Sequence, residues 1–523
     1  MEQRNASVSD AAVTGILRPG VNCWRVERTP RFYCIQDAAD YFRLVRQAML
    51  LAKHSIFTLG WDTAAAADLL PGEHPPDGPT TFKELVAHIA RRNRDLRIQI
   101  LTWDYASVYA LERDPFARLK FQWGTPPNVT FAFDGQHAAG GSHHQKIVVI
   151  DDALAFCGGI DLTGHRWDTC AHEVTEPRRV NVEGHPYGPY HEVGALGDGA
   201  LARALGELAR ERWRAVGVTD LPPLAPADGR DLWPADIEPD LRDVNVAISR
   251  TMPAIGDKPE IRECEALFVD SIAAARRSIY IESQYCTNDQ LGATLGARLR
   301  EPDGPEVILV SPQECHGWLE QNTVGTFRAV VFKHLLDADT HRRLRLVYPA
   351  ASVSQCVPVF VHSKVMIGDD SFLRIGSANF SRRSMSVDSE CDLAIDAAGE
   401  ARVEEGIRRV RHRLVGEHLG LEVDEVAEAL ARAGSLRALI DARASEDRTL
   451  ARVEVPPVTE TPEVVRDVAD PAEPIDLATT LESLVGADDR RPPVWRRWLS
   501  AAATRLRPRG RARAGQRRRA AFG

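Results

Sequence analysis

One short pattern of histidine, lysine and aspartate occurs twice in this sequence. The spacing H-x-K-x4-D is shared by His144, Lys146 and Asp151 in the first copy and His362, Lys364 and Asp369 in the second. In each copy a glycine also follows 14 residues after the histidine, at Gly158 and at Gly376. A single His-x-Lys is common at solvated strand edges, but two copies in the same register indicate a duplicated strand-turn unit.

The residue types in this pattern suit chemistry at phosphorus. Side chains two apart in a strand project from the same face, so we expect each histidine to point with its lysine. Two such strands face to face would form a pocket with two imidazoles and two ammonium groups. One imidazole could attack the phosphorus of a phosphodiester to give a phosphohistidine, while the other protonates the departing oxygen. The lysines would offset charge on the non-bridging oxygens, so we expect no cofactor and no metal ion at the reaction centre.

The remaining polar residues of the two segments are expected to have supporting roles. Asp151 and Asp369 complete the motif, and we expect them to brace their strands and turns rather than contact the substrate. His143 and His165 are expected to form local hydrogen bonds.

Helices and strands around the motifs are duplicated as well. The matching pairs are the amphipathic helices 36–54 and 261–277, the strands 55–59 and 278–281, the strands 98–101 and 307–310, and the strands 129–133 and 344–348. Thr81 and Glu84 fit a capping box at the start of a further helix. Strands that alternate with helices indicate the α/β class. We therefore predict two repeated α-β-α sandwich lobes with the active site at their pseudo-twofold interface.

Composition is typical of a soluble enzyme. The chain has 523 residues, of which 44% are hydrophobic, enough for two well-packed lobes. The first residues lack a basic region followed by an apolar stretch, and there is no apolar run of about 18 residues. Nine cysteines without CxxC spacing favour reduced thiols, so we expect a cytoplasmic protein.

The charge pattern divides the chain into four predicted parts. They are an N-terminal lobe at 1–240, a C-terminal lobe at 241–425, a helical then acidic and disordered linker at 426–489, and an arginine-rich amphipathic tail at 490–523. The tail contains 12 arginines and no acidic residue, so the rest of the chain has 53 basic and 74 acidic residues. Such asymmetry indicates that the tail binds a partner.

The tail also has one apolar stripe, which includes Trp495 and Trp498 and ends before Pro508. An arginine-rich helix with tryptophans on its other face suits an anionic bilayer surface. We expect a monomer that associates peripherally with the inner membrane face through this tail. Nucleic-acid binding is a less favoured alternative, and a third is that the tail has no role.

Further motifs resemble those of the phospholipase D superfamily, whose mark is the duplicated H-x-K-x4-D pattern. The segments are GGIDL at 158–162, RWD at 166–168, IYIESQY at 279–285, GSAN at 376–379, RSM at 383–385 and DSE at 388–390. They are similar to the phosphatidylcholine-hydrolysing branch, of bacterial type, over about residues 18 to 420. Two departures are Ser283, where asparagine is usual, and the segment PYHE at 189–192, where PWHD is usual.

The resemblance implies roles for individual residues. His144 would be the nucleophile and His362 the general acid and then base, although the sequence alone does not fix that order. Lys146 and Lys364 would hold the non-bridging oxygens. Ser377 and Asn379 would donate hydrogen bonds to the substrate phosphate. A histidine of this kind needs a carboxylate on its second nitrogen, and the candidates are Glu192, Glu390 and, as a fallback, Asp168.

The resemblance implies a phospholipase D that releases phosphatidate or transfers the phosphatidyl group to an alcohol. One alternative is a cardiolipin synthase-like phosphatidyltransferase or a nuclease of the same superfamily. Another is a non-catalytic phospholipid-binding scaffold, which would require decay of the motifs.

Overall fold

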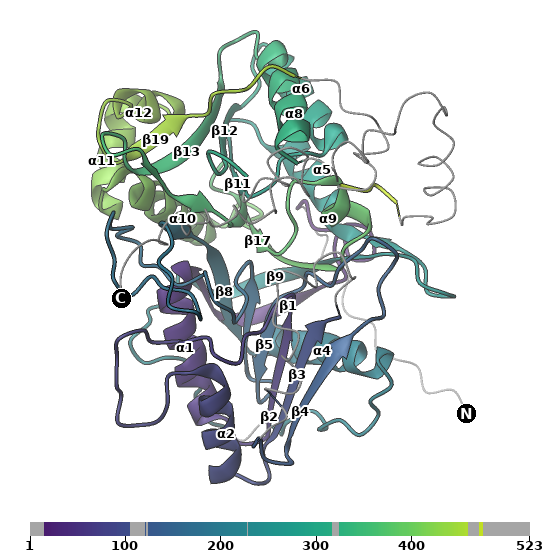
Figure 1. The fold of residues 1–523 in the computed structure, drawn as a ribbon. Helices are drawn as coiled ribbons and strands as arrows, with labels where there is room; N and C mark the ends of the chain where they lie inside the picture. The colour runs from purple at the N-terminus through teal and green to yellow at the C-terminus, as the bar shows by residue number, and fades with distance from the viewer. Residues whose placement is uncertain are drawn as a thin grey trace, which may run out of the picture. The chain divides into compact units, whose positions relative to one another are not determined.

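Two sheets with matching strand order form the centre of the molecule (Figure 1). The structure is a computed structural model, and it describes residues 15–104, 121, 124–226, 229–315, 324–458 and 470–473. The first sheet has the order β4-β3-β2-β5-β6-β8-β1. The second has the equivalent order β13-β12-β11-β16-β17-β18-β9. In each, three strands are parallel and the others antiparallel.

The elements of the first half precede those of the second along the chain. In the first half they are β1 (Arg25–Gln36), α1 (Asp37–Leu51), β2 (Ser55–Gly60), α2 (Phe82–Arg92), β3 (Arg97–Trp103), β4 (Val129–Asp134), β5 (Ile147–Ile150), β6 (Leu154–Gly158), β7 (Tyr190–His191), β8 (Val193–Asp198) and α4 (Ala200–Ala215).

The second half repeats most of this order and adds elements at its end. They are β9 (Leu241–Met252), β10 (Ile261–Arg262), α5 (Glu263–Ala274), β11 (Ser278–Ser283), α6 (Asp289–Arg300), β12 (Glu306–Val310), α8 (Val324–Ala338), β13 (Leu344–Ser352), β14 (Val357–Pro358), β15 (Phe360–Val361), β16 (Lys364–Gly368), β17 (Phe372–Gly376), α9 (Arg382–Ser386), β18 (Glu390–Asp396), α10 (Ala401–Leu419), α11 (Val423–Ala433), α12 (Leu436–Ala442) and β19 (Thr449–Arg452).

The two sheets join through their equivalent long strands, β1 and β9. These pair antiparallel from Arg25 opposite Ile248 to Phe32 opposite Leu241. Antiparallel pairing of equivalent strands relates the halves by a pseudo-twofold axis. The two motif segments can therefore approach each other across this axis.

Helices cover both faces of each sheet, because the strands alternate apolar side chains to either side. In the first half, α1 and α2 pack in one core. In the second, α5, α6 and α8 form the equivalent core. The opposite faces share a core with α4 and α10. The two repeated α-β-α lobes predicted from the sequence are confirmed.

Three details differ from the prediction. The first His-x-Lys segment lies just before its strand rather than within it, since β5 begins at Ile147, and the second reaches its strand only at Lys364, the first residue of β16. Thr81 is the N-cap residue of α2, but its side chain makes no capping hydrogen bond, so the capping box is wrong. In the predicted linker, the helices α11 and α12 lie at its start, where the sequence predicts helix, but a strand that was not predicted follows, since β19 pairs with β13.

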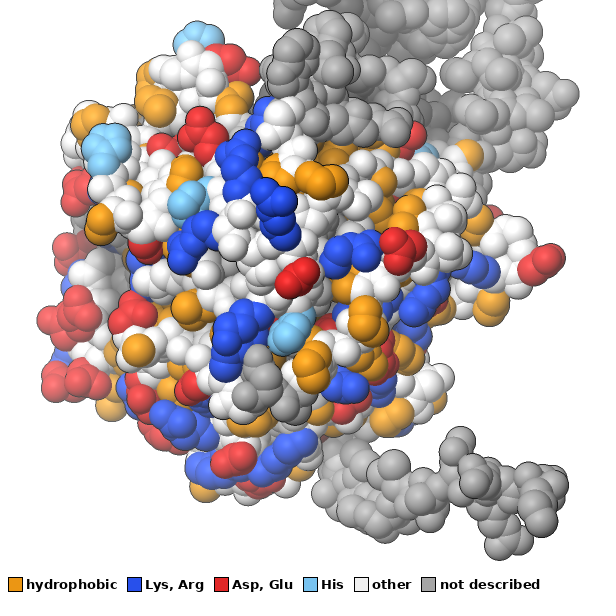
Figure 2. Space-filling view, turned by 90° about the horizontal axis from the view of Figure 1, so that it is seen from below, with side chains coloured by type: hydrophobic (Ala, Val, Ile, Leu, Met, Phe, Trp, Pro, Cys, Tyr) orange, Lys and Arg blue, Asp and Glu red, His pale blue; other side chains and the backbone are white. Residues whose placement is uncertain are grey.

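The predicted domain boundaries remain predictions. The described residues belong to one compact unit, Met1–Pro474, and the arginine-rich tail lies outside them. Among the described helices, none has the length and apolarity needed to span a bilayer. On the face shown in Figure 2, acidic and basic side chains are interspersed.

Candidate active site

Each motif segment is held by the backbone of the opposite half. The amide of His144 donates to the carbonyl of Ser389 at 2.9 Å, and the amide of His362 donates to the carbonyl of His191 at 2.9 Å. Residues just before each histidine also bridge across, through His143 with Ser389 and through the pairing of β15 with β7. Both motif histidines therefore lie at the interface between the halves.

Each motif histidine contacts a carboxylate of the opposite half. His144 Nδ1 lies 3.0 Å from Glu390 Oε2 and 3.1 Å from Oε1. His362 Nδ1 lies against Glu192 Oε1. Both carboxylates are fully buried. With Nδ1 engaged, Nε2 is the nitrogen left for chemistry. The structure thus brings both candidate carboxylates to the motif histidines and decides which carboxylate contacts which histidine.

In each pair, burial lowers the pKa of the histidine and raises the pKa of the glutamate. It lowers the pKa of His144 well below its ordinary value, and nearby Lys146 acts in the same direction. Burial also lowers the pKa of His362. It raises the pKa of Glu390, and it raises the pKa of Glu192 to about 8. Each pair can therefore exchange a proton without leaving an isolated buried charge.

The two motif lysines lie beside their histidines. Lys146 Nζ donates to the carbonyl of His144 at 3.1 Å and lies 3.1 Å from Asp161 Oδ2. Lys364 Nζ lies 3.2 Å from His362 Nδ1. Burial lowers the pKa of Lys364 well below its usual value. A phosphodiester anion would reverse that shift because it stabilises the ammonium form.

Ser377 and Asn379 both lie in the site, with different contacts. The Ser377 hydroxyl donates to Glu390 Oε2 at 2.5 Å, so the structure gives it a contact other than the predicted one with phosphate. Asn379 Oδ1 is buried without a hydrogen-bond partner among the described residues. By register, Asn379 is the counterpart of Asp161 in the first half. Its side chain remains the candidate for a substrate contact.

Arg166 and Asp161 are site residues to which the sequence assigned no role. Arg166 Nε lies 3.7 Å from Glu192 Oε1, and Arg166 Nη1 donates to the Tyr190 hydroxyl at 3.0 Å. Its charge is among the causes that lower the pKa of His362. The sequence could have indicated both residues, because Asp161 belongs to the GGIDL segment and Arg166 to the RWD segment.

Asp151 and Asp369 support the strands next to the motif strands. The carboxylate of Asp151 accepts from the amides of residues 53, 54 and 55, at 2.7 to 2.8 Å. The carboxylate of Asp369 accepts from the amides of residues 276, 277 and 278. Both aspartates have a positive φ, of 51° and 54°. They fix the starts of β2 and β11.

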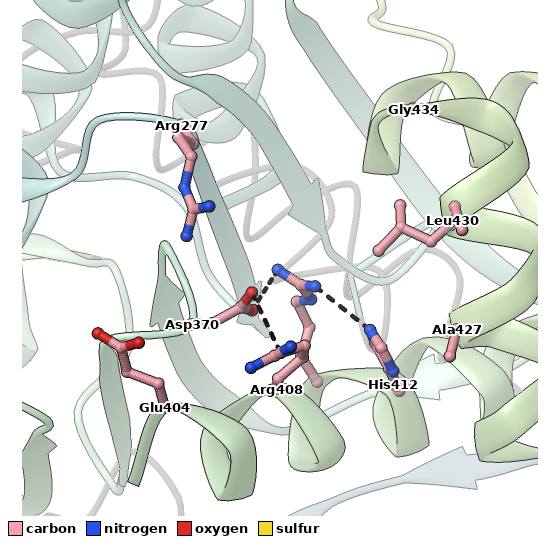
Figure 3. A pocket seen from close by; sticks show the side chains of 10 residues that line it. Arg277, Asp370, Glu404, Arg408, His412, Ala427, Leu430 and Gly434 are labelled. Carbon is pink, nitrogen blue, oxygen red and sulfur yellow. Dashed lines mark hydrogen bonds and ion pairs between the residues drawn. The ribbon is translucent and has the colours of Figure 1, made fainter. Parts of the chain in front are cut away.

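The next residue of each turn is a second aspartate, and each pairs with an arginine from the helix behind it. Arg210 of α4 holds both oxygens of Asp152, at 2.6 and 2.8 Å. Arg411 of α10 contacts Oδ1 of Asp370, and Arg408 of the same helix lies near Oδ2. Figure 3 shows Asp370 beside Arg408 at a pocket of about 510 Å³, which Arg411 also lines. Arg408 and Arg411 pair with Asp370 of the turn after β16. This pocket therefore lies behind the motif strand, and His362 and Lys364 are not among its lining residues.

Asp168 lies apart from both motif histidines. Arg179 Nη1 donates to its two oxygens at 3.0 and 3.1 Å, and His172 Nδ1 lies 3.0 Å away. Glu192 and Glu390 occupy the positions for which Asp168 was the fallback. His143 makes local contacts, with Ser389 Oγ at 2.9 Å and Asp134 Oδ1 at 3.1 Å.

Comparison with known proteins finds a matching family model and several relatives. Residues 268–409 match the family model described as cardiolipin synthase, PLD-like domain. Phospholipase D alpha 1 of Nicotiana tabacum is 22% identical over 70% of this chain and 60% of that protein. Phospholipase D alpha 1 of Zea mays is 24% identical over 75% of this chain and 64% of that protein. The chain thus spans less than two thirds of the length of these relatives.

One solved structure shares the fold over most of its length. The phosphatidylserine synthase of Haemophilus influenzae Rd KW20 has a TM-score of 0.50 and 11% identity, covering 79% of this chain and 94% of that one. This likeness concerns the fold alone. The duplicated motif, the relatives and the family model all support the phospholipase D superfamily for this chain.

Proposed function

We propose that the chain is a phospholipase D-type phosphodiesterase. It would break the headgroup phosphodiester of a glycerophospholipid and release phosphatidate, or transfer the phosphatidyl group to an alcohol. The observation that supports this most is the crossed arrangement of His144 with Glu390 and His362 with Glu192. Each half supplies a reactive imidazole and the carboxylate that orients the other one.

In the first step, His144 Nε2 attacks phosphorus. A nitrogen–phosphorus bond forms while the bond from phosphorus to the headgroup oxygen breaks. That oxygen takes a proton from Nε2 of His362, and Glu192 balances the charge of this imidazole. Lys146 and Lys364 hold the non-bridging oxygens, where charge increases.

In the second step, water or an alcohol attacks the same phosphorus. His362 takes the proton of the incoming oxygen, and the bond from His144 to phosphorus breaks. Water yields phosphatidate, and an alcohol yields a new phosphatidyl ester. Both histidines return to their starting protonation, so the cycle needs no further reactant.

A phosphatidyltransferase is the second candidate. It is favoured by the match of residues 268–409 to a cardiolipin synthase-type domain. The two candidates share the phosphohistidine step and differ in the acceptor. A nuclease of the same superfamily would share it too, with a nucleic-acid substrate. A non-catalytic scaffold fits less well, since both buried histidine–carboxylate pairs are present.

The decisive assay is mass spectrometry of products after incubation with mixed cellular phospholipids and ethanol. Phosphatidate together with phosphatidylethanol is expected for the wild type. His144→Ala and His362→Ala should each abolish both products, and His412→Ala, outside the site, should retain them. Cardiolipin as the main product would favour the transferase. Cleavage of DNA without any lipid product would overturn the proposal in favour of the nuclease.

The same assay can assign the histidines. With a substrate that has a good leaving group, His362→Ala is expected to trap the phosphoryl adduct on His144. An adduct found on His362 in the converse variant, and none on His144, would reverse the assignment.

A further inference from the structure

A second buried cluster of histidines and carboxylates lies behind Glu192. Its members come from four separate elements: Asp37 begins α1, His172 lies in the loop after β6, His191 is in β7, and Glu417 is near the end of α10. Their side chains are at most 2% exposed. One donor atom from each lies within 4.8 Å of the other three.

The spacing of the donor atoms of these four residues fits a common ligand, with Asp37 facing each histidine through a different carboxylate oxygen. His172 Nε2 is 2.9 Å from Glu417 Oε1 and 3.6 Å from Asp37 Oδ2. His191 Nδ1 is 3.2 Å from Asp37 Oδ1 and 2.5 Å from Glu417 Oε1. Ligands about 2.1 Å from a tetrahedral ion lie about 3.4 Å apart. Three of the four separations are within about half an ångström of that value, and the fourth would have to open.

The other nitrogen of each histidine is already fixed by a carboxylate. His172 Nδ1 lies 3.0 Å from Asp168 Oδ2, and His191 Nε2 lies 2.9 Å from Glu282 Oε2. A metal-bound histidine in proteins almost always has its second nitrogen held in this way, which sets the tautomer that leaves the ligating nitrogen free.

The charge of the cluster also calls for a cation. Four buried carboxylates, Asp37, Asp168, Glu282 and Glu417, contact the two histidines. Arg179 contacts Asp168, and a third histidine, His418, lies with its Nε2 3.2 Å from Glu282 Oε1. Asp37 Oδ2 is buried without a hydrogen-bond partner among the described residues. Buried carboxylates in such excess need a cation or protons to be stable.

We propose that Asp37, His172, His191 and Glu417 bind one divalent transition-metal ion. Two imidazoles with two carboxylates suit zinc, manganese or ferrous ions, whereas calcium and magnesium prefer oxygen ligands alone. This inference does not depend on the proposed function, because the four ligands are not motif residues.

The ion would act by holding Glu192 in place. The amide of Glu192 donates to Asp37 Oδ1 at 3.0 Å, and the amide of Asp37 donates to the carbonyl of Glu192 at 2.8 Å. His191 is the preceding residue. An ion bound to Asp37 and His191 would therefore fix the segment from which Glu192 reaches His362. The ion supports the site from behind and takes no part in the reaction at phosphorus.

The test is the metal content of the full chain, produced with zinc, manganese and iron in the medium and dialysed against metal-free buffer. Inductively coupled plasma mass spectrometry should find about one metal ion per chain. His172→Ala and Glu417→Gln should each lose it, and the control His412→Ala should keep it. Cobalt bound by the wild type in place of the native ion should give visible d–d absorption, a readout that does not depend on the stability of the variants.

The opposing explanation is that protons alone balance the carboxylates, with both histidines as imidazolium ions. It predicts less than about 0.1 ion per chain, no cobalt spectrum, and no rise in Tm when zinc, manganese or ferrous ions are added. That result would overturn the metal site. It would leave the proposed function untouched, since phosphatidylethanol formation is measured separately.

Discussion

Replacing Glu390 with glutamine tests the crossed histidine–carboxylate pairs most directly. The change keeps the size of the side chain and removes the carboxylate from His144 Nδ1, now 3.0 Å away. As Nε2 bonds to phosphorus, positive charge develops on the imidazole. The carboxylate can balance that charge and an amide cannot, so the loss should appear mainly in kcat.

The magnitude follows from the type of hydrogen bond. A bond to a charged group contributes about 1.5 to 3 kcal/mol, so its loss should lower kcat by about 10- to 150-fold. Ser377→Ala removes only the neutral hydroxyl that donates to Glu390 at 2.5 Å. Because the Glu390 carboxylate and its contact with His144 remain, we expect the barrier to rise by only about 1 kcal/mol, which corresponds to about a 5-fold decrease in kcat.

The assay is steady-state release of the headgroup, with thermal unfolding as the check on folding. From highest to lowest, the expected order of kcat is wild type, Ser377→Ala, Glu390→Gln and His144→Ala. Glu192→Gln should behave like Glu390→Gln, because it acts on the second histidine. A folded Glu390→Gln enzyme with wild-type kcat would refute the assignment of this carboxylate to His144.

Three other predictions test the turn, the lysine and the tail. Arg210→Met leaves Asp152 buried without its bidentate partner and should lower the free energy of unfolding by about 3 to 5 kcal/mol. The control Arg242→Met, which removes an exposed partner of Glu238, should change the free energy of unfolding by less than about 0.5 kcal/mol. Because burial lowers the pKa of Lys364 and an anion raises it again, binding of tungstate, a phosphate analogue, should take up protons and weaken as the pH rises. Calorimetry in two buffers that detects no proton uptake would contradict this. Deletion of residues 490–523 removes 12 arginines. It should abolish the salt-sensitive sedimentation of the protein with anionic vesicles, while hydrolysis of a short-chain substrate stays near normal. Unchanged sedimentation would exclude membrane docking by the tail, and loss of RNA affinity instead would show that the tail binds nucleic acid.

The sequence by itself determined the repeated architecture and the reactive residues. Alternating helix and strand patterns located α1, β2, β3 and their counterparts in the second half, because these elements depend mainly on the local periodicity of apolar residues. The repeated H-x-K-x4-D spacing identified the two histidines and lysines in the same way. Asp151 and Asp369 brace strands, as the sequence predicted, through contacts with three consecutive amides each.

Only the tertiary structure decided how the site is assembled. His144 and Glu390 are 246 residues apart, and their contact exists because β1 and β9 pair and bring the two halves together about a pseudo-twofold axis. The sequence offered Glu192 and Glu390 without assigning either to a histidine. The buried cluster around His191 likewise draws its residues from four separate elements. Such contacts have no local signal, since they depend on long-range strand pairing and packing rather than on the spacing of neighbours along the chain.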